Sequence, residues 1–290
     1  MIESFLRFAE FEKRYSTHTL KSYENDLKQL EDYIKDHILI QDLSHHDIRS
    51  WIIHLSENGL SAKSINRKLA TLKSFYKFLQ SREIIKKNPT ERLKPLKTDS
   101  KLPQFIKEKE ITQLLDNMEF ENSFEGKRDQ LILELLYGSG IRLSELIGLK
   151  IHQINFFDHS IKVLGKRNKE RVIPINNNLV KYIKSYIIVR DNFATDKSLD
   201  FLIIKEDGAP AYPMLVYRVV KKYLSLITTQ SKKSPHVLRH TFATHLLNKG
   251  ADLNSVKDLL GHTSLAATQV YTHNSLEKLK SVFEQAHPKA

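Results

Sequence analysis

Apolar residues in the first hundred positions recur at steps of three and four, the period of an α-helix with one buried face. One such run follows Ser16 and consists of Leu20, Tyr23, Leu27, Leu30 and Ile34. Another follows Ser61 and consists of Ile65, Leu69, Leu72, Tyr76 and Leu79. Both serines suit the start of a helix, where a side-chain oxygen accepts a backbone hydrogen bond. With a further segment from Ser44 to Asn58, the pattern predicts a small bundle of four helices.

The helical pattern stops in a proline-containing segment over residues 88–103. Three prolines and little periodicity are typical of a linker, which we place at residues 94–103. A chain of 290 residues is long enough for two ordinary domains. We therefore expect a helical domain over residues 1–93 and a second, larger domain over residues 104–290.

The larger domain alternates between helical and strand patterns. Helical spacing covers residues 106–118, 127–137 and 212–227. Strand-like apolar residues flank residues 165–169, and they are Ile161, Val163, Val172, Ile173 and Ile175. This arrangement predicts a β-hairpin with a basic tip, and a short apolar run at residues 201–204 predicts an edge strand or a second hairpin. The expected class is mainly α with a small β-sheet, that is, an α+β domain.

The segment from residue 234 to residue 273 is expected to contain three further helices. Gly250 ends the first, and the second runs from Asp252 to Gly261, because glycine commonly terminates a helix. The third carries Tyr271. The segment also contains several histidines and an arginine that core packing does not require.

The distribution of charge favours a polyanionic partner. The chain has 46 Lys or Arg against 34 Asp or Glu, a net charge of +12, which suits nucleic acid or an anionic membrane but also occurs in generically basic proteins. Residues 60–101 hold twelve Lys or Arg against three Asp or Glu. On the predicted helix, Lys63 and Arg67 are four positions apart, and so are Lys73 and Lys77, so the members of each pair are neighbours on the helix surface. Because solvated faces usually mix both signs, we expect these residues to contact DNA; a merely solvated face is the alternative.

Composition excludes several classes of protein. The chain contains no cysteine, which rules out disulfides, thiolate catalysis and cysteine-ligated zinc. Its first sixteen residues include acids and no long apolar run, so they do not resemble a signal or transit peptide. No segment has the length and apolar character of a membrane span. We therefore expect a soluble, cytoplasmic protein.

Candidate phosphate-binding residues occur in two parts of the larger domain. His236 and Arg239 lie three positions apart, so they share a face near the start of a helix. Arg142 follows a glycine-rich turn at residues 138–140, where backbone amides and a guanidinium group can bind an anion together. An ion pair between Arg142 and Glu145 is an equally good explanation of that arginine.

Other chemistries fit the sequence less well. His236 and His240 have the spacing of a helical zinc pair, but no glutamate stands where the zinc protease motif requires one. The chain also contains no nucleophile elbow for a serine triad and no Walker loop for ATP. We expect neither a metal nor another cofactor.

Five motifs in one order make the sequence similar to a known family. They are GSGIRLSEL at residues 138–146, GKRNKER at residues 165–171, HVLRH at residues 236–240, LLGH at residues 259–262, and Tyr271. Each motif alone is weak, but the ordered set resembles the tyrosine recombinase (phage integrase) family. The two-domain layout and the ending Ala286-His287-Pro288 resemble its Xer subfamily.

The site residues that this resemblance implies are Arg142, Lys166, His236, Arg239, His262 and Tyr271. Tyr271 would attack a DNA phosphate and give a 3′-phosphotyrosine and a free 5′-hydroxyl. The two arginines would stabilise charge on the non-bridging oxygens, and Lys166 would protonate the leaving oxygen. His236 would act in proton transfer with Tyr271, and His262 would hydrogen-bond the phosphate. The covalent intermediate conserves the bond energy, so neither ATP nor a metal is implied.

The resemblance also implies a fold and partners. The N-terminal helices would form a SAM-like core-binding domain, and with the catalytic domain they would make a C-shaped clamp around double-stranded DNA. Four protomers, identical or shared with a paralogue, would exchange strands through a Holliday junction, with residues 275–290 packing into a neighbour. The Xer subfamily resolves chromosome dimers before segregation, and a septal DNA translocase of the FtsK type is an implied partner.

Three alternatives stay open at this point. A mobile-element integrase or a type IB topoisomerase would share the nucleophile, and a DNA-binding protein without activity would share the fold. One departure from the family pattern is Arg167, which stands where the hairpin usually has a second glycine. A turn that requires a positive φ there would be strained, but the assignment of Lys166 is unaffected.

Overall fold

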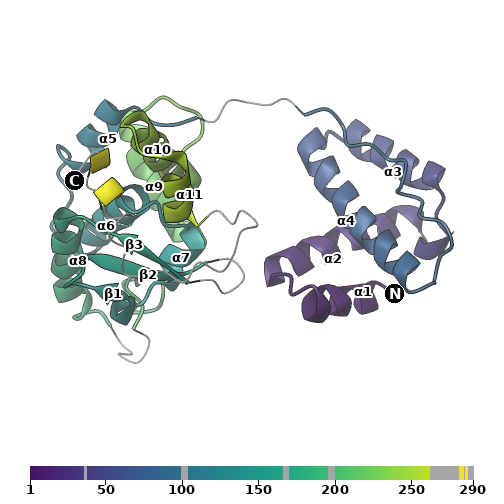
Figure 1. The fold of residues 1–290 in the computed structure, drawn as a ribbon, viewed down its shortest axis with the longest axis horizontal. Coiled ribbons are helices and arrows are strands. Elements are labelled where there is room, and N and C mark those ends of the chain that lie inside the picture. Colours follow the sequence, from purple (N-terminus) through teal and green to yellow (C-terminus); the bar gives the residue numbers. More distant parts are fainter. Residues whose placement is uncertain are drawn as a thin grey trace. The chain divides into compact units, whose positions relative to one another are not determined.

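The structure is a computed structural model that describes residues 1–35, 38–98, 104–165, 170–194, 200–261, 281–283 and 285–286. The chain divides into two compact units, Met1–Lys101 and Leu102–Ala290 (Figure 1). Each unit has its own cluster of buried apolar residues. The boundary between the units falls inside the segment that the proline pattern marks as a linker.

The first unit is a helical bundle, as the apolar spacing predicts. Its helices are α1 (Ile2–Arg7), α2 (Thr17–Ile34), α3 (His45–Glu57) and α4 (Ala62–Ser81). A π-helical turn over Phe8–Glu12 follows α1, and a 3-10 turn over Ile40–Asp42 precedes α3. The predicted caps are present, because the side chains of Ser16 and Ser61 accept hydrogen bonds from backbone N–H groups three residues later.

One face of α4 forms much of the core of this unit. Phe75 and Tyr76 are fully buried there, in the same apolar cluster as Trp51 of α3. The Tyr76 hydroxyl donates a hydrogen bond of 2.6 Å to the carbonyl oxygen of Ile40, so this buried polar group is satisfied. The opposite face of α4 carries the cations that the sequence analysis predicts to contact DNA.

The residues that follow α4 stay attached to the first unit as far as Leu96. Leu93 is buried in the apolar cluster of the bundle. Asn66 of α4 exchanges two hydrogen bonds with the backbone of Leu96, at 2.9 and 2.7 Å. The first residues of the predicted linker therefore pack on the bundle.

The second unit is an α+β domain. Its helices are α5 (Glu108–Leu115), α6 (Phe124–Gly138), α7 (Leu143–Gly148), α8 (Asn177–Arg190), α9 (Pro213–Ile227), α10 (Pro235–Asn248) and α11 (Leu253–Leu260). A 3-10 turn over Ile151–Gln153 leads into the strands β1 (Ile154–Asn155), β2 (Ser160–Leu164) and β3 (Glu170–Pro174). The strands pair antiparallel in the order β1-β2-β3, with Ile161 opposite Ile173. The β2–β3 pair is the hairpin that the alternating pattern predicts.

Helix α6 is the central element of the second unit and packs against α5, α7, α8, α9 and α10. Nearly all of its side chains are buried, including the run from Leu131 to Leu136. The C-terminal half of α6, from Leu131 onwards, is apolar apart from Glu134, and an apolar helix segment is stable in such an interior position. Its C-terminal end therefore provides a rigid base for the turn that carries Arg142.

Two features differ from the sequence predictions. Helix α8 has no counterpart among the predicted helices, and its β-branched run at residues 187–189 has weak helix propensity, which packing against α6 compensates. Within the described chain, the apolar run at residues 201–204 forms isolated bridges to Lys150 and Pro210 instead of a strand. Proline has no N–H group with which to continue a β-ladder.

Candidate active site

Arg142 lies at the junction of α6 and α7, where the chain turns sharply. Gly140 has a φ of +59°, a conformation that glycine adopts without strain. A Cβ atom on this residue would lie 2.5 Å from the ring of Phe242, so close packing against α10 also requires glycine. The turn places Arg142 directly before the first turn of α7.

The guanidinium group of Arg142 has two acceptors in the described chain. It donates to Oε1 of Glu145 at 2.7 Å and to the carbonyl oxygen of Gly261 at 2.8 Å. The backbone N–H of Arg142 also donates to Oε2 of Glu145, at 2.8 Å. The ion pair that the sequence suggested is therefore present. The Arg142 side chain is 27% exposed, so part of it is accessible from solution.

Arg239 lies on α10 and is buried. Its guanidinium group donates to the carbonyl oxygens of Gly140 and Leu260, the second at 2.6 Å. Burial, followed by the positive charges of Arg142 and Arg171, lowers the pKa of Arg239 to about 9. The side chain remains a cation at neutral pH, and an anion close to it would be stabilising.

A third arginine, Arg171 of β3, is not among the site residues that the sequence predicts. Its guanidinium group forms a two-pronged ion pair with Glu145, at 2.6 and 2.8 Å, and its Nε–H donates to the carbonyl oxygen of Leu259 at 3.1 Å. Its side chain is 4% exposed. Arg171 belongs to the motif at residues 165–171, but no feature of that motif indicates a carboxylate 26 residues away.

We call Arg142, Arg171 and Arg239 the arginine cluster. They meet at the C-terminal end of α11. Helix α11 packs against α10, beside which it lies in Figure 1, and against β3. The three consecutive carbonyl oxygens of residues 259–261 each accept a hydrogen bond from a different member of the cluster. The last carbonyl groups of a helix lack partners within the helix, and the helix dipole favours cations there. The cluster therefore fixes the position at which the chain leaves α11.

Glu145 is the carboxylate at the centre of the arginine cluster. Burial raises its pKa, but the hydrogen bonds and charges of Arg171, followed by those of Arg142, outweigh this effect and lower the pKa to about 2. Glu145 is therefore ionised at neutral pH. One carboxylate and three guanidinium groups give the described part of this cluster an excess of positive charge, which suits an anion such as a phosphate.

The remaining predicted site residues divide into two groups. His236 occupies the second position of α10, one turn before Arg239, and its side chain is exposed. Lys166, His262 and Tyr271 lie outside the described residues. The structure thus brings Arg142 and Arg239 together at the end of α11 and places His236 on the helix that carries Arg239.

The described residues show neither a metal-binding cluster nor a membrane-spanning helix. Those residues contain no group of three or more histidine and carboxylate side chains that could hold a metal ion. None of the helices described has both the length and the apolar character needed to cross a membrane.

The predicted DNA-contacting residues lie on the side of α4 opposite its buried face. Lys63, Arg67 and Lys77 are exposed, and Lys73 is partly exposed. Arg67 also forms an ion pair with the buried Asp26 of α2. The four cations share one accessible face, and their contact with DNA stays a prediction.

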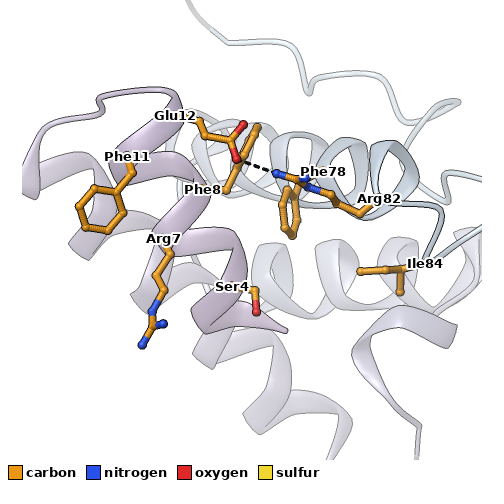
Figure 2. A pocket seen from close by; sticks show the side chains of 8 residues that line it. All are labelled: Ser4, Arg7, Phe8, Phe11, Glu12, Phe78, Arg82 and Ile84. Carbon is orange, nitrogen blue, oxygen red and sulfur yellow. Dashed lines mark hydrogen bonds and ion pairs between the residues drawn. The ribbon is translucent and has the colours of Figure 1, made fainter.

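A hollow on the surface of the first unit contains none of the predicted site residues. Its lining includes Phe8, Phe11 and Phe78, from the first helical segment and from α4 (Figure 2). Arg82 at this hollow is paired with Glu12 at 2.6 Å. The hollow therefore offers aromatic surface rather than a site built for a phosphate.

Comparison with known proteins identifies the family of both units. The model of the phage integrase family matches residues 104–278, and the model of the phage integrase N-terminal SAM-like domain matches residues 2–83. The chain belongs to the phage integrase family. It is therefore a tyrosine recombinase, an enzyme that cleaves and rejoins DNA.

Curated relatives are similar to this recombinase over its whole length. A tyrosine recombinase XerC of Chlorobaculum parvum is 36% identical over 318 residues, which cover 100% of this chain and 94% of the relative. A tyrosine recombinase XerD of Staphylococcus aureus is 36% identical over 293 residues, which cover 100% of this chain and 99% of the relative. The Xer assignment made from the motifs is confirmed.

Solved structures of recombinases share the fold. The XerH site-specific recombinase bound to a palindromic difH substrate has a TM-score of 0.73 with this chain, at 20% identity, over 97% of this chain and 82% of that one. The Tn1549 transposon integrase in complex with circular intermediate DNA has a TM-score of 0.71, at 23% identity, over 96% of this chain and 97% of that one. The expected fold, a SAM-like helical domain and a tyrosine recombinase catalytic domain, is confirmed.

Proposed function

We propose that this Xer-type site-specific recombinase uses an active site made of Arg142, Lys166, His236, Arg239, His262 and Tyr271. The arginine cluster is the observation that carries the proposal. It combines two of the motif arginines with an excess of positive charge, within the domain that matches the phage integrase family. A cleavage site for DNA requires such a charge, because the reacting phosphate is an anion.

Arg142 and Arg239 are arranged to stabilise the scissile phosphate. The hydrogen bonds within the described chain use two of the five N–H groups of each guanidinium. Further N–H groups can donate to the non-bridging oxygens, where negative charge increases in the transition state. Because carbonyl oxygens already fix both side chains, binding of DNA requires little reorganisation of the two arginines.

Tyr271 provides the nucleophile in this proposal. Its hydroxyl oxygen attacks the phosphorus while the bond from phosphorus to the 5′-oxygen breaks, which leaves a 3′-phosphotyrosine. His236 assists removal of the phenolic proton, Lys166 donates a proton to the leaving 5′-oxygen, and His262 hydrogen-bonds the phosphate. Attack by a 5′-hydroxyl from the other duplex reverses the step and joins the exchanged strands.

The proposed partners are DNA and further recombinase subunits. The cations on α4 would bind the phosphate backbone of the recombination site. Four protomers, identical or shared with a paralogue, would act on two sites through a Holliday junction. The full-length similarity to XerC and XerD supports resolution of chromosome dimers before segregation, in the cytoplasm, with a septal translocase of the FtsK type as a further partner.

Covalent trapping tests the proposed active site. DNA cross-linked to the protein in cells is sequenced to find the target site, and a nicked copy of that site then traps the cleaved intermediate in vitro. We expect an adduct on Tyr271 with the wild type, unaffected by a chelator, and no adduct with Tyr271→Phe, which should still bind DNA. An adduct that persists in Tyr271→Phe, or maps to another residue, would refute the assignment.

A further inference from the structure

We propose that Arg171 is a positioning residue for strand cleavage, which holds the guanidinium groups of Arg142 and Arg239 in place through Glu145 and the C-terminal end of α11. This inference rests on the proposed function of Arg142 and Arg239 at the phosphate. Arg171 itself is not placed to bind DNA, because its side chain is 4% exposed and each of its three guanidinium nitrogens already donates to Glu145 or to the carbonyl oxygen of Leu259. Its effect would therefore pass through other groups.

The first connection runs through the carboxylate of Glu145. Arg171 donates to Oε1 at 2.6 Å and to Oε2 at 2.8 Å. Arg142 donates to the same two oxygens, from its side chain at 2.7 Å and from its backbone at 2.8 Å. Four donors thus fix one buried carboxylate from two directions. Without Arg171, the carboxylate would lose two of these donors and could rotate, together with the Arg142 side chain that it orients.

The second connection runs through the end of α11. Arg171 donates to the carbonyl oxygen of Leu259. The next two carbonyl oxygens, of residues 260 and 261, accept from Arg239 and Arg142 respectively. Gly261 permits this arrangement, because a Cβ atom there would lie 2.9 Å from Cδ of Arg171. Movement of the α11 end would therefore change the acceptors of both proposed catalytic arginines at once.

The position of Arg171 in the hairpin adds a third connection. Arg171 lies on β3 and pairs with Val163 of β2, and Lys166 belongs to the segment that joins these two strands in the sequence. Arg171 thus connects this hairpin to α7 and to α11 by hydrogen bonds. The strands of the hairpin flank Lys166 in the sequence, α7 directly follows Arg142, and the end of α11 binds Arg239.

An arginine suits this position better than a lysine. The planar guanidinium group donates in fixed directions to both oxygens of Glu145 and, through Nε–H, to the carbonyl oxygen of Leu259. A lysine would keep the positive charge next to Glu145 but could not reproduce this fork. Arg171→Lys therefore separates the geometric role of Arg171 from its charge.

Single-turnover cleavage of the nicked target site at saturating DNA tests this role. We expect the rate of Tyr271 adduct formation to fall on the order of 100-fold in Arg171→Gln and in Arg171→Lys, while the affinity for the uncut site changes less than about twofold. A double-variant cycle adds a readout that simple destabilisation would not give. If Arg171 acts partly through Arg142, Arg171→Gln should slow cleavage less in the Arg142→Ala background than in the wild type, and the remaining loss would pass through Arg239.

Arg190 supplies a matched control in the same unit. Like Arg171 it is buried, and it donates through Nε to a carbonyl oxygen and through Nη1 to a carboxylate, both at 2.9 Å. Arg190→Gln should lower the melting temperature without slowing cleavage below that temperature. Wild-type rates in folded Arg171→Gln, or equal losses in Arg190→Gln, would overturn the positioning role. Failure of the proposed function would give a different result: an adduct that persists in Tyr271→Phe would refute Tyr271 as the nucleophile, whatever the effect of Arg171→Gln.

Discussion

Arg67 of α4 forms a two-pronged ion pair with Asp26 of α2, and one of its two hydrogen bonds measures 2.8 Å. The Asp26 carboxylate is completely buried and also accepts from Lys68 at 2.9 Å and from Thr71 at 2.8 Å. Arg67 is half-exposed, so it joins the interior of the bundle to the surface that is predicted to bind DNA. Its ion pair with a buried carboxylate distinguishes Arg67 from Lys63 and Lys77 on the same exposed face.

Removing the Asp26 carboxylate should destabilise the first unit strongly. Asp26→Ala leaves the buried ammonium group of Lys68 without its carboxylate, which costs about 3–5 kcal/mol in comparable sites. Urea unfolding followed by the fluorescence of Trp51, the single tryptophan of the chain, reports on this unit. Asp32→Ala, at an exposed position on the same helix, should change the free energy of unfolding by less than about 0.5 kcal/mol. Equal effects of the two substitutions would contradict the structural role of Asp26.

Charge reversal at Lys63 and Lys77 should weaken DNA binding and flatten its salt dependence. Each phosphate contact that is lost removes about 0.9 from the slope of log K against log salt concentration. Trp51 fluorescence should show unchanged stability, because both side chains are exposed. Lys28→Glu on α2 is a control, since Lys28 is already paired with Glu24 at 2.7 Å. An unchanged slope in Lys63→Glu/Lys77→Glu would show that this face of α4 is merely solvated.

Alanine at Gly261 should affect cleavage more than alanine at Gly250. Both glycines follow a helix with a positive φ, +62° at Gly261 and +89° at Gly250, and alanine in this conformation costs about 1–2 kcal/mol. No atom lies within 4 Å of a Cβ at Gly250, whereas a Cβ at Gly261 would displace Arg171. Melting temperatures should fall in both variants, and the rate of adduct formation should fall about tenfold or more only in Gly261→Ala. Similar rates in the two variants would argue against a role for the α11 end.

The pH dependence of stability should contain a contribution from Glu145. Its pKa is about 2 in the folded protein and about 4.5 when unfolded, so its ion pairs stabilise the fold fully above pH 4.5. As the pH falls from 4.5 towards 2, about 3 kcal/mol of stability should be lost. Urea unfolding followed by circular dichroism should show that the deficit of Glu145→Gln relative to wild type shrinks over this range. Glu170→Gln, at an exposed pair with Lys162, should show almost no such change.

Much of the secondary structure could be predicted from local sequence. Helices α2, α3 and α4 begin at the serines that the pattern indicates, and the β2–β3 hairpin follows the alternation around Ile161 and Val163. These signals are local, because caps and periodicity depend on residues within a few positions. Helix α8 lacked such a signal, since its β-branched residues fit either structure and packing against α6 decides between them.

The sequence by itself determined the family and the residue types of the proposed site, because five ordered motifs mark them without any contact being known. Only the tertiary structure decided that Arg171 belongs with Arg142 and Arg239, and that Arg142 reaches the carbonyl oxygen of Gly261, 119 residues further along the chain. The physical reason is that most acceptors of these guanidinium groups are backbone carbonyl oxygens. Every residue has a backbone carbonyl group, so the sequence does not indicate which of them will accept a hydrogen bond from an arginine. That depends on where a helix ends and on which side chains pack against its last carbonyl groups.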